Sequence, residues 1–126
     1  MYYKQRRGAD GETAAVGFLV GRGWRVIARN IELGGVEVDV LAVDPGPPST
    51  LVVVEVRSAR SSKYGAPEEN VDRSKVGRLY RAMAELRRTD GLVADLPTAS
   101  VRVDLVVVDG RGGRQEIRHL RALEPA

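Results

Sequence analysis

The alternation of hydrophobic and polar positions marks out the first elements of the chain. Apolar residues at helical spacing follow Asp10, an expected helix N-cap, and predict a helix over about residues 10–22. The segment 24–30 has the composition of a strand, and Gly34 and Gly35 predict a turn after it. The N-terminal part of the chain therefore predicts a helix, then a strand that enters a hairpin.

Residues 36–44 have the two-residue period of a strand with one polar face. The period places Glu37 and Asp39 on one face, and the valines at positions 36, 38 and 40 are expected on the other. This strand therefore predicts a row of carboxylates opposite a buried apolar face.

The next strand, predicted over residues 51–58, follows after a short loop rich in Pro and Gly. In this strand Glu55 and Arg57 share one face, and Val56 is expected to point into the core on the opposite side. The short loop favours an antiparallel hairpin between the two strands. Pairing of this kind would bring the polar faces of both strands together.

A second helix is predicted over about residues 70–89, and two more strands over 100–109 and 116–120. The apolar stripe of this second helix is expected to be buried, and three basic residues lie beside one another on the other side of the helix. The stripe contains Val76, Leu79, Tyr80, Met83 and Leu86, and the basic residues are Lys75, Arg78 and Arg81. The predicted order is α-β-β-β-α-β-β, an α/β fold with a mixed sheet of about five strands flanked by helices. Residues 1–9 are expected to form a basic flexible arm, and residues 10–126 a single domain.

The composition narrows the chemistry that this domain can perform. The chain has 126 residues, 43% of them hydrophobic, with no cysteine and one histidine. The absence of cysteine excludes disulfides, thiolate metal sites and cysteine nucleophiles, and His119 alone disfavours a histidine-based triad and is expected to be structural. No apolar run is long enough for a membrane span or a secretory signal, so a cytoplasmic protein without a membrane partner is expected. Carboxylates, basic residues and hydroxyls remain as the candidate reactive groups.

The formal net charge of +3 conceals an uneven distribution. Residues 32–56 contain five acidic residues and no basic residue, whereas residues 1–31 and 57–88 are both strongly basic. On charge alone, a solvated surface would explain this segregation. The direction in which the acidic residues point decides between that explanation and a site.

Asp39 and Glu55 are the acidic residues that the strand pattern directs towards each other. Two facing carboxylates repel unless a base or a divalent cation lies between them. One interpretation is a salt-bridged polar face in which Arg57 neutralises both. The other is a site for Mg²⁺ or Mn²⁺, which prefer oxygen ligands, with the carbonyl of Val56 as a further ligand.

A set of residues along the chain gives this second interpretation a family context. The set consists of Gly8, Gly11, Glu12, Ala15, Trp24, Arg29, Asn30, Glu37, Asp39, Val54, Glu55, Val56, Arg57, Lys75, Arg78, Leu79, Val103, Asp104 and Val106. In the order and spacing of these residues, the chain resembles the YraN-like family of small bacterial proteins, a group placed in the PD-(D/E)xK nuclease superfamily and similar to archaeal Holliday-junction resolvases. The resemblance extends from about residue 8 to residue 120.

The resemblance implies a restriction-endonuclease-like core and specific roles for four residues. Asp39 and Glu55 match the two metal-binding acids, and Glu12 on the first helix matches an accessory acid. Arg57 stands where the superfamily has lysine, which orients or deprotonates the attacking water. An arginine remains protonated, so Arg57 can only stabilise negative charge.

The implied activity is hydrolysis of phosphodiesters in DNA of branched or structured form, assisted by Mg²⁺ or Mn²⁺. The expected contacts to backbone phosphates come from basic residues of the second helix and of the arm: Lys75, Arg78, Lys4, Arg6 and Arg7. A homodimer is expected by analogy only. Two alternatives stay open: a nucleic-acid-binding module with weak or no hydrolysis because of Arg57, and an interaction protein with no nucleic-acid role.

Overall fold

The computed structural model describes residues 6–59, 66–69, 71–89, 98 and 100–126, and for residues 6–10 it describes the backbone alone. The order of elements within these residues is the predicted α-β-β-β-α-β-β. The elements are α1 (Arg6–Gly21), β1 (Arg25–Leu33), β2 (Val36–Asp44), β3 (Thr50–Ala59), α2 (Arg73–Thr89), β4 (Ser100–Asp109) and β5 (Glu116–Leu120).

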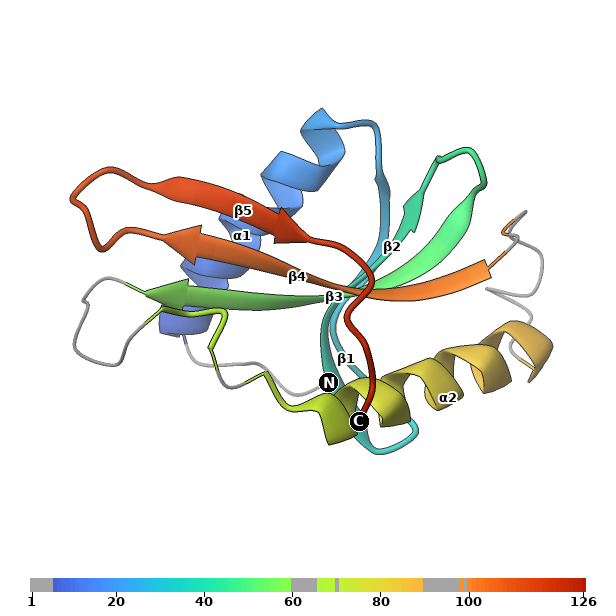
Figure 1. Ribbon diagram of the computed structural model, residues 1–126. Coiled ribbons are helices and arrows are strands. Elements are labelled where there is room, and N and C mark those ends of the chain that lie inside the picture. Colours follow the sequence, from blue (N-terminus) through green and yellow to red (C-terminus); the bar gives the residue numbers. More distant parts are fainter. Residues whose placement is uncertain (1–5, 60–65, 70, 90–97, 99) are drawn as a thin grey trace.

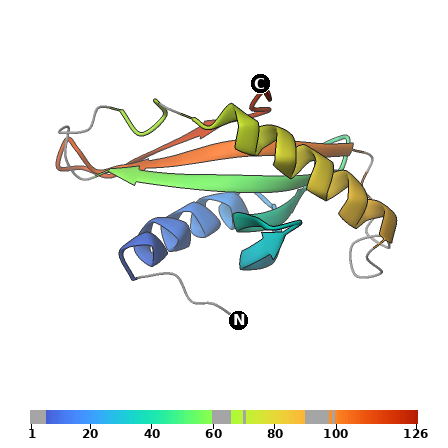
Figure 2. The same cartoon turned by 90° about the horizontal axis from the view of Figure 1, so that it is seen from below.

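The five strands form one mixed sheet in the order β1-β2-β3-β4-β5 (Figure 1). Neighbouring strands are antiparallel except β3 and β4, which are parallel and are connected through α2. The two helices lie on opposite faces of the sheet, α1 on one and α2 on the other (Figure 2). This arrangement confirms the predicted α/β class and is consistent with a nuclease-like core.

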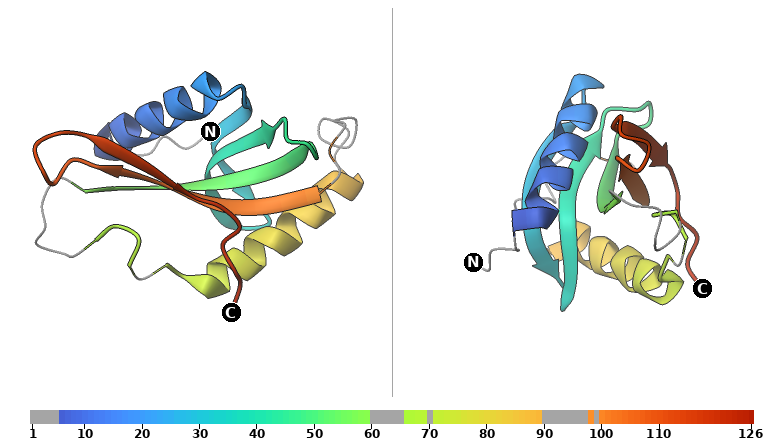
Figure 3. Two further views of the ribbon diagram at one scale, coloured as in Figure 1. Left: turned by 45° about the horizontal axis from the view of Figure 1, so that its top comes forward. Right: turned by 90° about the vertical axis from the view of Figure 1, so that its left-hand side faces the viewer.

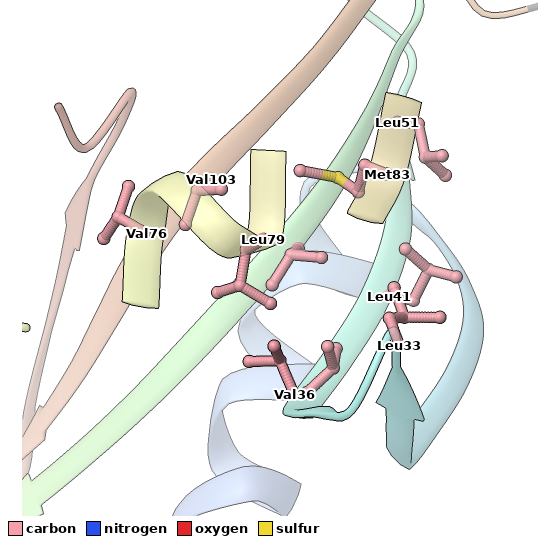
Figure 4. Packing of buried hydrophobic residues seen from close by; sticks show 10 residues of the cluster. Leu33, Val36, Leu41, Leu51, Val76, Leu79, Met83 and Val103 are labelled. Carbon is pink, nitrogen blue, oxygen red and sulfur yellow. The ribbon is translucent and has the colours of Figure 1, made fainter. Parts of the chain in front are cut away.

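Each helix covers its own hydrophobic cluster. The α1-side cluster consists of Ala15, Leu19, Trp24, Val40, Ala42, Val52, Val54, Val106 and Val108. The α2-side cluster, shown in part in Figure 4, consists of Leu33, Val36, Val38, Leu41, Leu51, Val53, Val76, Leu79, Met83 and Val103. Because β3 contributes to both clusters, residues 51–54 form an uninterrupted apolar run, as is typical of a strand that is buried on both faces.

The bounds of four elements differ from the prediction, those of β3 by one residue at each end. Helix α1 begins at Arg6, so Asp10 lies within the helix and residues 6–9 belong to it rather than to an arm. Strand β1 extends to Leu33, because Leu33 is buried in the α2-side cluster. Helix α2 begins at Arg73, where the Oδ1 atom of Asp72 accepts a hydrogen bond from the backbone N–H of Lys75 at 3.1 Å and caps the first turn.

The C-terminal segment crosses from the end of β5 to the beginning of α2 (Figure 3). The backbone N–H of Leu123 donates to the carbonyl of Val103 at 2.7 Å, and the hydroxyl of Tyr80 donates to the carbonyl of Leu123 at 3.1 Å. These bonds attach the segment both to the sheet and to α2.

Candidate functional site

The candidate site lies where β2 separates from β3. The two strands pair from Asp44 and Thr50 as far as Val40 and Val54. Beyond that point residues 36–38 pair with β1 and residues 55–59 pair with β4. The end of the β1–β2 hairpin therefore separates from the rest of the sheet, as Figure 1 shows, and Asp39 and Glu55 each lie one residue beyond the last β2–β3 pair.

Where the two strands separate, β2 reverses the faces on which its side chains lie. Val38 packs in the α2-side cluster, but Val40 packs in the α1-side cluster. In a regular strand these two residues would share a face, so the prediction that positions 36, 38 and 40 share one face is wrong at Val40. Asp39 lies between these two residues, so the regular alternation of the strand does not fix the face on which its side chain lies.

The carboxylate of Asp39 lies against the backbone of β3. Its Oδ2 atom accepts a hydrogen bond from the backbone N–H of Val56 at 2.8 Å. Continued pairing would have placed Val38 opposite Val56, so the carboxylate takes the place of a strand partner where β2 has departed. Asp39 is 7% exposed, so its carboxylate is largely buried.

Glu55 lies on the face of β3 that α2 covers. Its Oε2 atom is 3.0 Å from Nζ of Lys75, and the exposed fractions of the side chains are 16% for Glu55 and 28% for Lys75. The prediction that Lys75 lies with Arg78 and Arg81 on the solvated side of the helix is therefore wrong for Lys75. Burial of the stripe that contains Val76 and Leu79 places Lys75 at the margin of that stripe, within reach of Glu55.

Arg57 is exposed and, with Glu55, lines a small cavity between β3, the start of α2 and the C-terminal segment. The volume of the cavity is about 20 Å³, which is enough for one water molecule. Asp72 adds a third polar side chain to the lining, which is otherwise formed by Val71, Val76, Leu105 and Leu123. Glu55 and Arg57 thus share a face, as the sequence predicts.

Glu12 lies on the α1 side of the same stretch of β3. It is 3% exposed, and the preceding residue, Gly11, packs so closely that a Cβ atom there would lie 3.2 Å from the Cβ and Oγ atoms of Ser58. A glycine therefore allows α1 to approach β3 at Ser58. The described ranges nevertheless contain no group of three or more His, Cys, Asp or Glu side chains placed to hold a metal ion, so Glu12 does not complete such a group.

The two remaining acids, Asp39 and Glu55, fit a cation that keeps most of its water. Mg²⁺ commonly binds through one or two carboxylates, with water and substrate phosphate as the other ligands. Asp39 contacts the backbone of Val56, the residue after Glu55 in β3, and both acids offer carboxylate oxygens as ligands. The donor set therefore suits Mg²⁺ or Mn²⁺, and the role of the Val56 carbonyl stays a prediction.

The residues predicted to contact nucleic acid have different outcomes. Arg78 is exposed on α2, a helix with six basic residues and one acidic residue. Lys4 lies outside the described residues, and Arg6 and Arg7 are described only as backbone in the first turn of α1. Of these four residues, Arg78 is the one whose side chain the structure describes, and its contact with nucleic acid stays a prediction.

A second polar group is a hydrogen-bond network centred on Asp104, which was not predicted from the sequence. Burial would raise the pKa of Asp104, but hydrogen bonds with His119, Arg102 and the backbone N–H of Ala122 outweigh burial and lower it below its usual range. His119 also packs edge-on against the rings of Trp24 and Phe18, which supports the structural role predicted for it. The sequence signal was an Arg-x-Asp pair inside a buried strand, where an unpaired charge would be unfavourable.

The architecture is that of a small α/β domain and is consistent with a nuclease-like core. The sequence profile of the uncharacterised protein family UPF0102 matches residues 11–108. The chain belongs to this family, which is the YraN-like family that its sequence resembles.

Individual relatives support the same membership. A UPF0102 protein of Paenarthrobacter aurescens (strain TC1) is 36% identical over 124 residues, which are 98% of this chain and 97% of that protein. A UPF0102 protein of Persephonella marina is 35% identical over 102 residues, 81% of this chain and 82% of the relative. One from Deinococcus radiodurans is 31% identical over 114 residues, 90% of this chain and 89% of the relative. In the part of the chain that the structure describes, no helix has the length and apolar character needed to span a membrane.

Proposed function

We propose that this protein is an endonuclease-like phosphodiester hydrolase that uses Mg²⁺ or Mn²⁺ and acts on DNA of branched or structured form. The observation that supports the proposal is the placement of two acids where β2 leaves β3: Asp39 accepts a hydrogen bond from Val56 N–H, and Glu55, the neighbouring residue of β3, pairs with Lys75. The family resemblance adds the class of reaction and of substrate.

Asp39 and Glu55 would hold the cation. When bound, the cation supplies activation of water and neutralisation of charge on the phosphate oxygens. Asp39 is suited to this task because the Val56 N–H holds its carboxylate in one orientation. Lys75 orients Glu55 before substrate arrives, since its ammonium forms an ion pair with Oε2 of Glu55 at 3.0 Å.

Arg57 and the basic face of α2 would act on the substrate phosphates. Arg57 is exposed beside Glu55, so its guanidinium is available to stabilise negative charge on the scissile phosphate. Arg78 would contact a neighbouring backbone phosphate, and Lys4, Arg6 and Arg7 would extend the contacts. Contacts of this kind bind without reading sequence, which agrees with a substrate recognised by shape. A homodimer would allow two such sites to cut opposing strands.

The test is cleavage of a synthetic four-way junction in the presence of Mn²⁺. Asp39→Asn should reduce the rate to below about 1% of wild type, because it removes a charged ligand while keeping the shape of the side chain. Glu37→Gln is the matched control, since Glu37 is an exposed acid two residues away on the same strand. Cleavage that survives Asp39→Asn would contradict the site assignment.

The second candidate function is a DNA-binding module with weak or no hydrolysis. It is favoured by one observation, the arginine at position 57, because a guanidinium does not give up a proton to act as a base. Salt-sensitive binding to the junction without cleavage in Mg²⁺ or Mn²⁺ would favour it, and activity gained by Arg57→Lys would identify the missing group. The absence of both metal binding and DNA affinity at low salt would instead favour an interaction protein.

A further inference from the structure

Asn30 occupies the position opposite Asp39 in the β1–β2 hairpin. The flanking pairs are Arg29 with Val40 and Ile31 with Val38, which leaves Asn30 and Asp39 facing each other across the two strands. The φ angle of Asn30 is 53°, in the left-handed region. Among residues other than glycine, asparagine is one of the few that enter this region readily.

The left-handed residue coincides with the reversal of faces in both strands. In β1, Arg29 donates from Nη2 to Oγ1 of Thr13 in α1 at 3.3 Å, whereas Ile31, two residues later, packs against the α2-side cluster. In β2 the same reversal separates Val38 from Val40. Since both strands turn over at one pair, the backbone of Asn30 accounts for the reversal that directs Asp39 to Val56.

The side chain of Asn30 adds a second observation. Its Oδ1 atom is buried and accepts no hydrogen bond from the residues that the structure describes. A buried acceptor without a donor is unfavourable, and glycine would adopt the left-handed backbone with less strain. The backbone alone therefore does not explain an asparagine here, whereas a donor that arrives with a ligand does.

We propose that Asn30 is a positioning residue of the Asp39 site. Its left-handed backbone turns the carboxylate of Asp39 towards β3, and its buried amide oxygen accepts a hydrogen bond from a water molecule held at the site. The role of the backbone stands on the geometry of the hairpin, and the role of the amide rests on the proposed function, because the water is one that a bound divalent cation carries.

The backbone role is tested by amide hydrogen exchange of Val56, whose N–H donates to Asp39. Asn30→Gly keeps the left-handed conformation and should preserve slow exchange. Asn30→Ala disfavours that conformation and should accelerate exchange of Val56 at least about 10-fold. Asn30→Gln, which keeps an amide but disfavours the left-handed region, replaces Asn30→Ala if that variant does not fold.

The matched control is Gly35→Ala, which places the same backbone strain in the turn of the same hairpin. Gly35 has φ 80°, and a Cβ there would meet no atom within 4 Å. This variant should lose stability as Asn30→Ala does, but Val56 should stay protected. Equal exchange of Val56 in the Asn30→Ala and Gly35→Ala variants would overturn the backbone role.

The amide role is tested by calorimetric titration with Mn²⁺ alone. Asn30→Gly should weaken Mn²⁺ binding about 10-fold without loss of Val56 protection, and Gly35→Ala should leave the affinity unchanged. An Asn30→Gly variant that binds Mn²⁺ as tightly as wild type would overturn the amide role. If wild type neither binds Mn²⁺ nor cleaves, the proposed function and the amide role fail together, and Val56 exchange still decides the backbone role.

Discussion

Asp104 provides the sharpest test of the network that joins β5 and the C-terminal segment to β4. Its side chain is fully buried, with 0% exposed. Oδ1 accepts from Arg102 Nε at 2.7 Å and from Ala122 N–H at 3.0 Å, while Oδ2 lies 2.9 Å from Arg102 Nη2 and 2.8 Å from His119 Nε2. Asp104→Asn keeps the shape but removes the charge and one acceptor atom, so part of this set of bonds is lost.

The magnitude follows from what remains around Arg102. Removal of one partner from a buried ion pair costs about 3–5 kcal/mol, because the other charge is left uncompensated. Asp44 stays 2.8 Å from Nη2 of Arg102, so the lower end of that range applies. We therefore expect Asp104→Asn to lower the free energy of unfolding by about 3 kcal/mol at pH 7, and Tm by roughly 10 °C.

Urea denaturation followed by the fluorescence of Trp24 measures this change directly. Trp24 is the single tryptophan of the chain, and its ring lies 5.4 Å from that of His119, next to the network. Glu85→Gln is the control, since it breaks an ion pair with Arg88 whose side chains are 60% and 71% exposed. The control should lose less than about 0.5 kcal/mol.

The pH dependence supplies an independent check. Because the pKa of Asp104 is lower in the folded protein than the usual 3.9, its carboxylate stabilises the fold above that value, and the stabilisation is lost as the pH falls through the folded-state pKa. The difference between wild type and Asp104→Asn should therefore narrow when the pH is lowered from 7 to about 3. A loss below about 1 kcal/mol at pH 7, or a difference that does not narrow in acid, would refute the reasoning.

Two further predictions concern the basic residues of α2. Lys75→Met should tighten Mn²⁺ binding about 3–10-fold, because it removes the positive charge beside Glu55, and it should slow junction cleavage about 10–100-fold. Weaker Mn²⁺ binding of this variant in a calorimetric titration would instead mean that Lys75 is needed to hold Glu55 in position for the cation. Arg78→Gln should reduce the slope of log K for junction binding against log salt by about 1, as expected for one lost phosphate contact. Arg88 lies in the last turn of the same helix and is paired with Glu85, so Arg88→Gln should change this slope less. Equal slopes for the two variants would contradict a phosphate contact of Arg78.

Much of the fold could be predicted because its signals are local. The period of two in the strands, the apolar stripe of α2 and the Gly and Pro turns each involve neighbouring residues. Strands β2, β4 and β5 therefore begin and end at the predicted residues. The predicted start of α1 was wrong. Asp10 has the side chain of a good N-cap, but residues 6–9 before it are also helical, so the helix begins at Arg6.

The candidate site was predictable only in part. Two acids on neighbouring strands of a hairpin were enough to indicate a common location for Asp39 and Glu55, and the composition had already removed cysteine chemistry and most histidine chemistry. The partner of Glu55 was not predictable, because Lys75 follows it by 20 residues and reaches it only when α2 packs on the sheet. The role of Asn30 was equally hidden, since its neighbours in sequence read as an ordinary strand.

The sequence by itself determined the order of elements, the two-sided burial of β3 and the presence of two acids that need compensation. These features depend on the periodicity of the residues and on the free-energy cost of desolvating a charge, and neither depends on the details of the tertiary structure. Only the tertiary structure decided how Asp39 escapes the alternation of β2. That outcome needs the left-handed backbone of Asn30 on a different strand and the departure of β2 from β3, which leaves the N–H of Val56 in need of an acceptor.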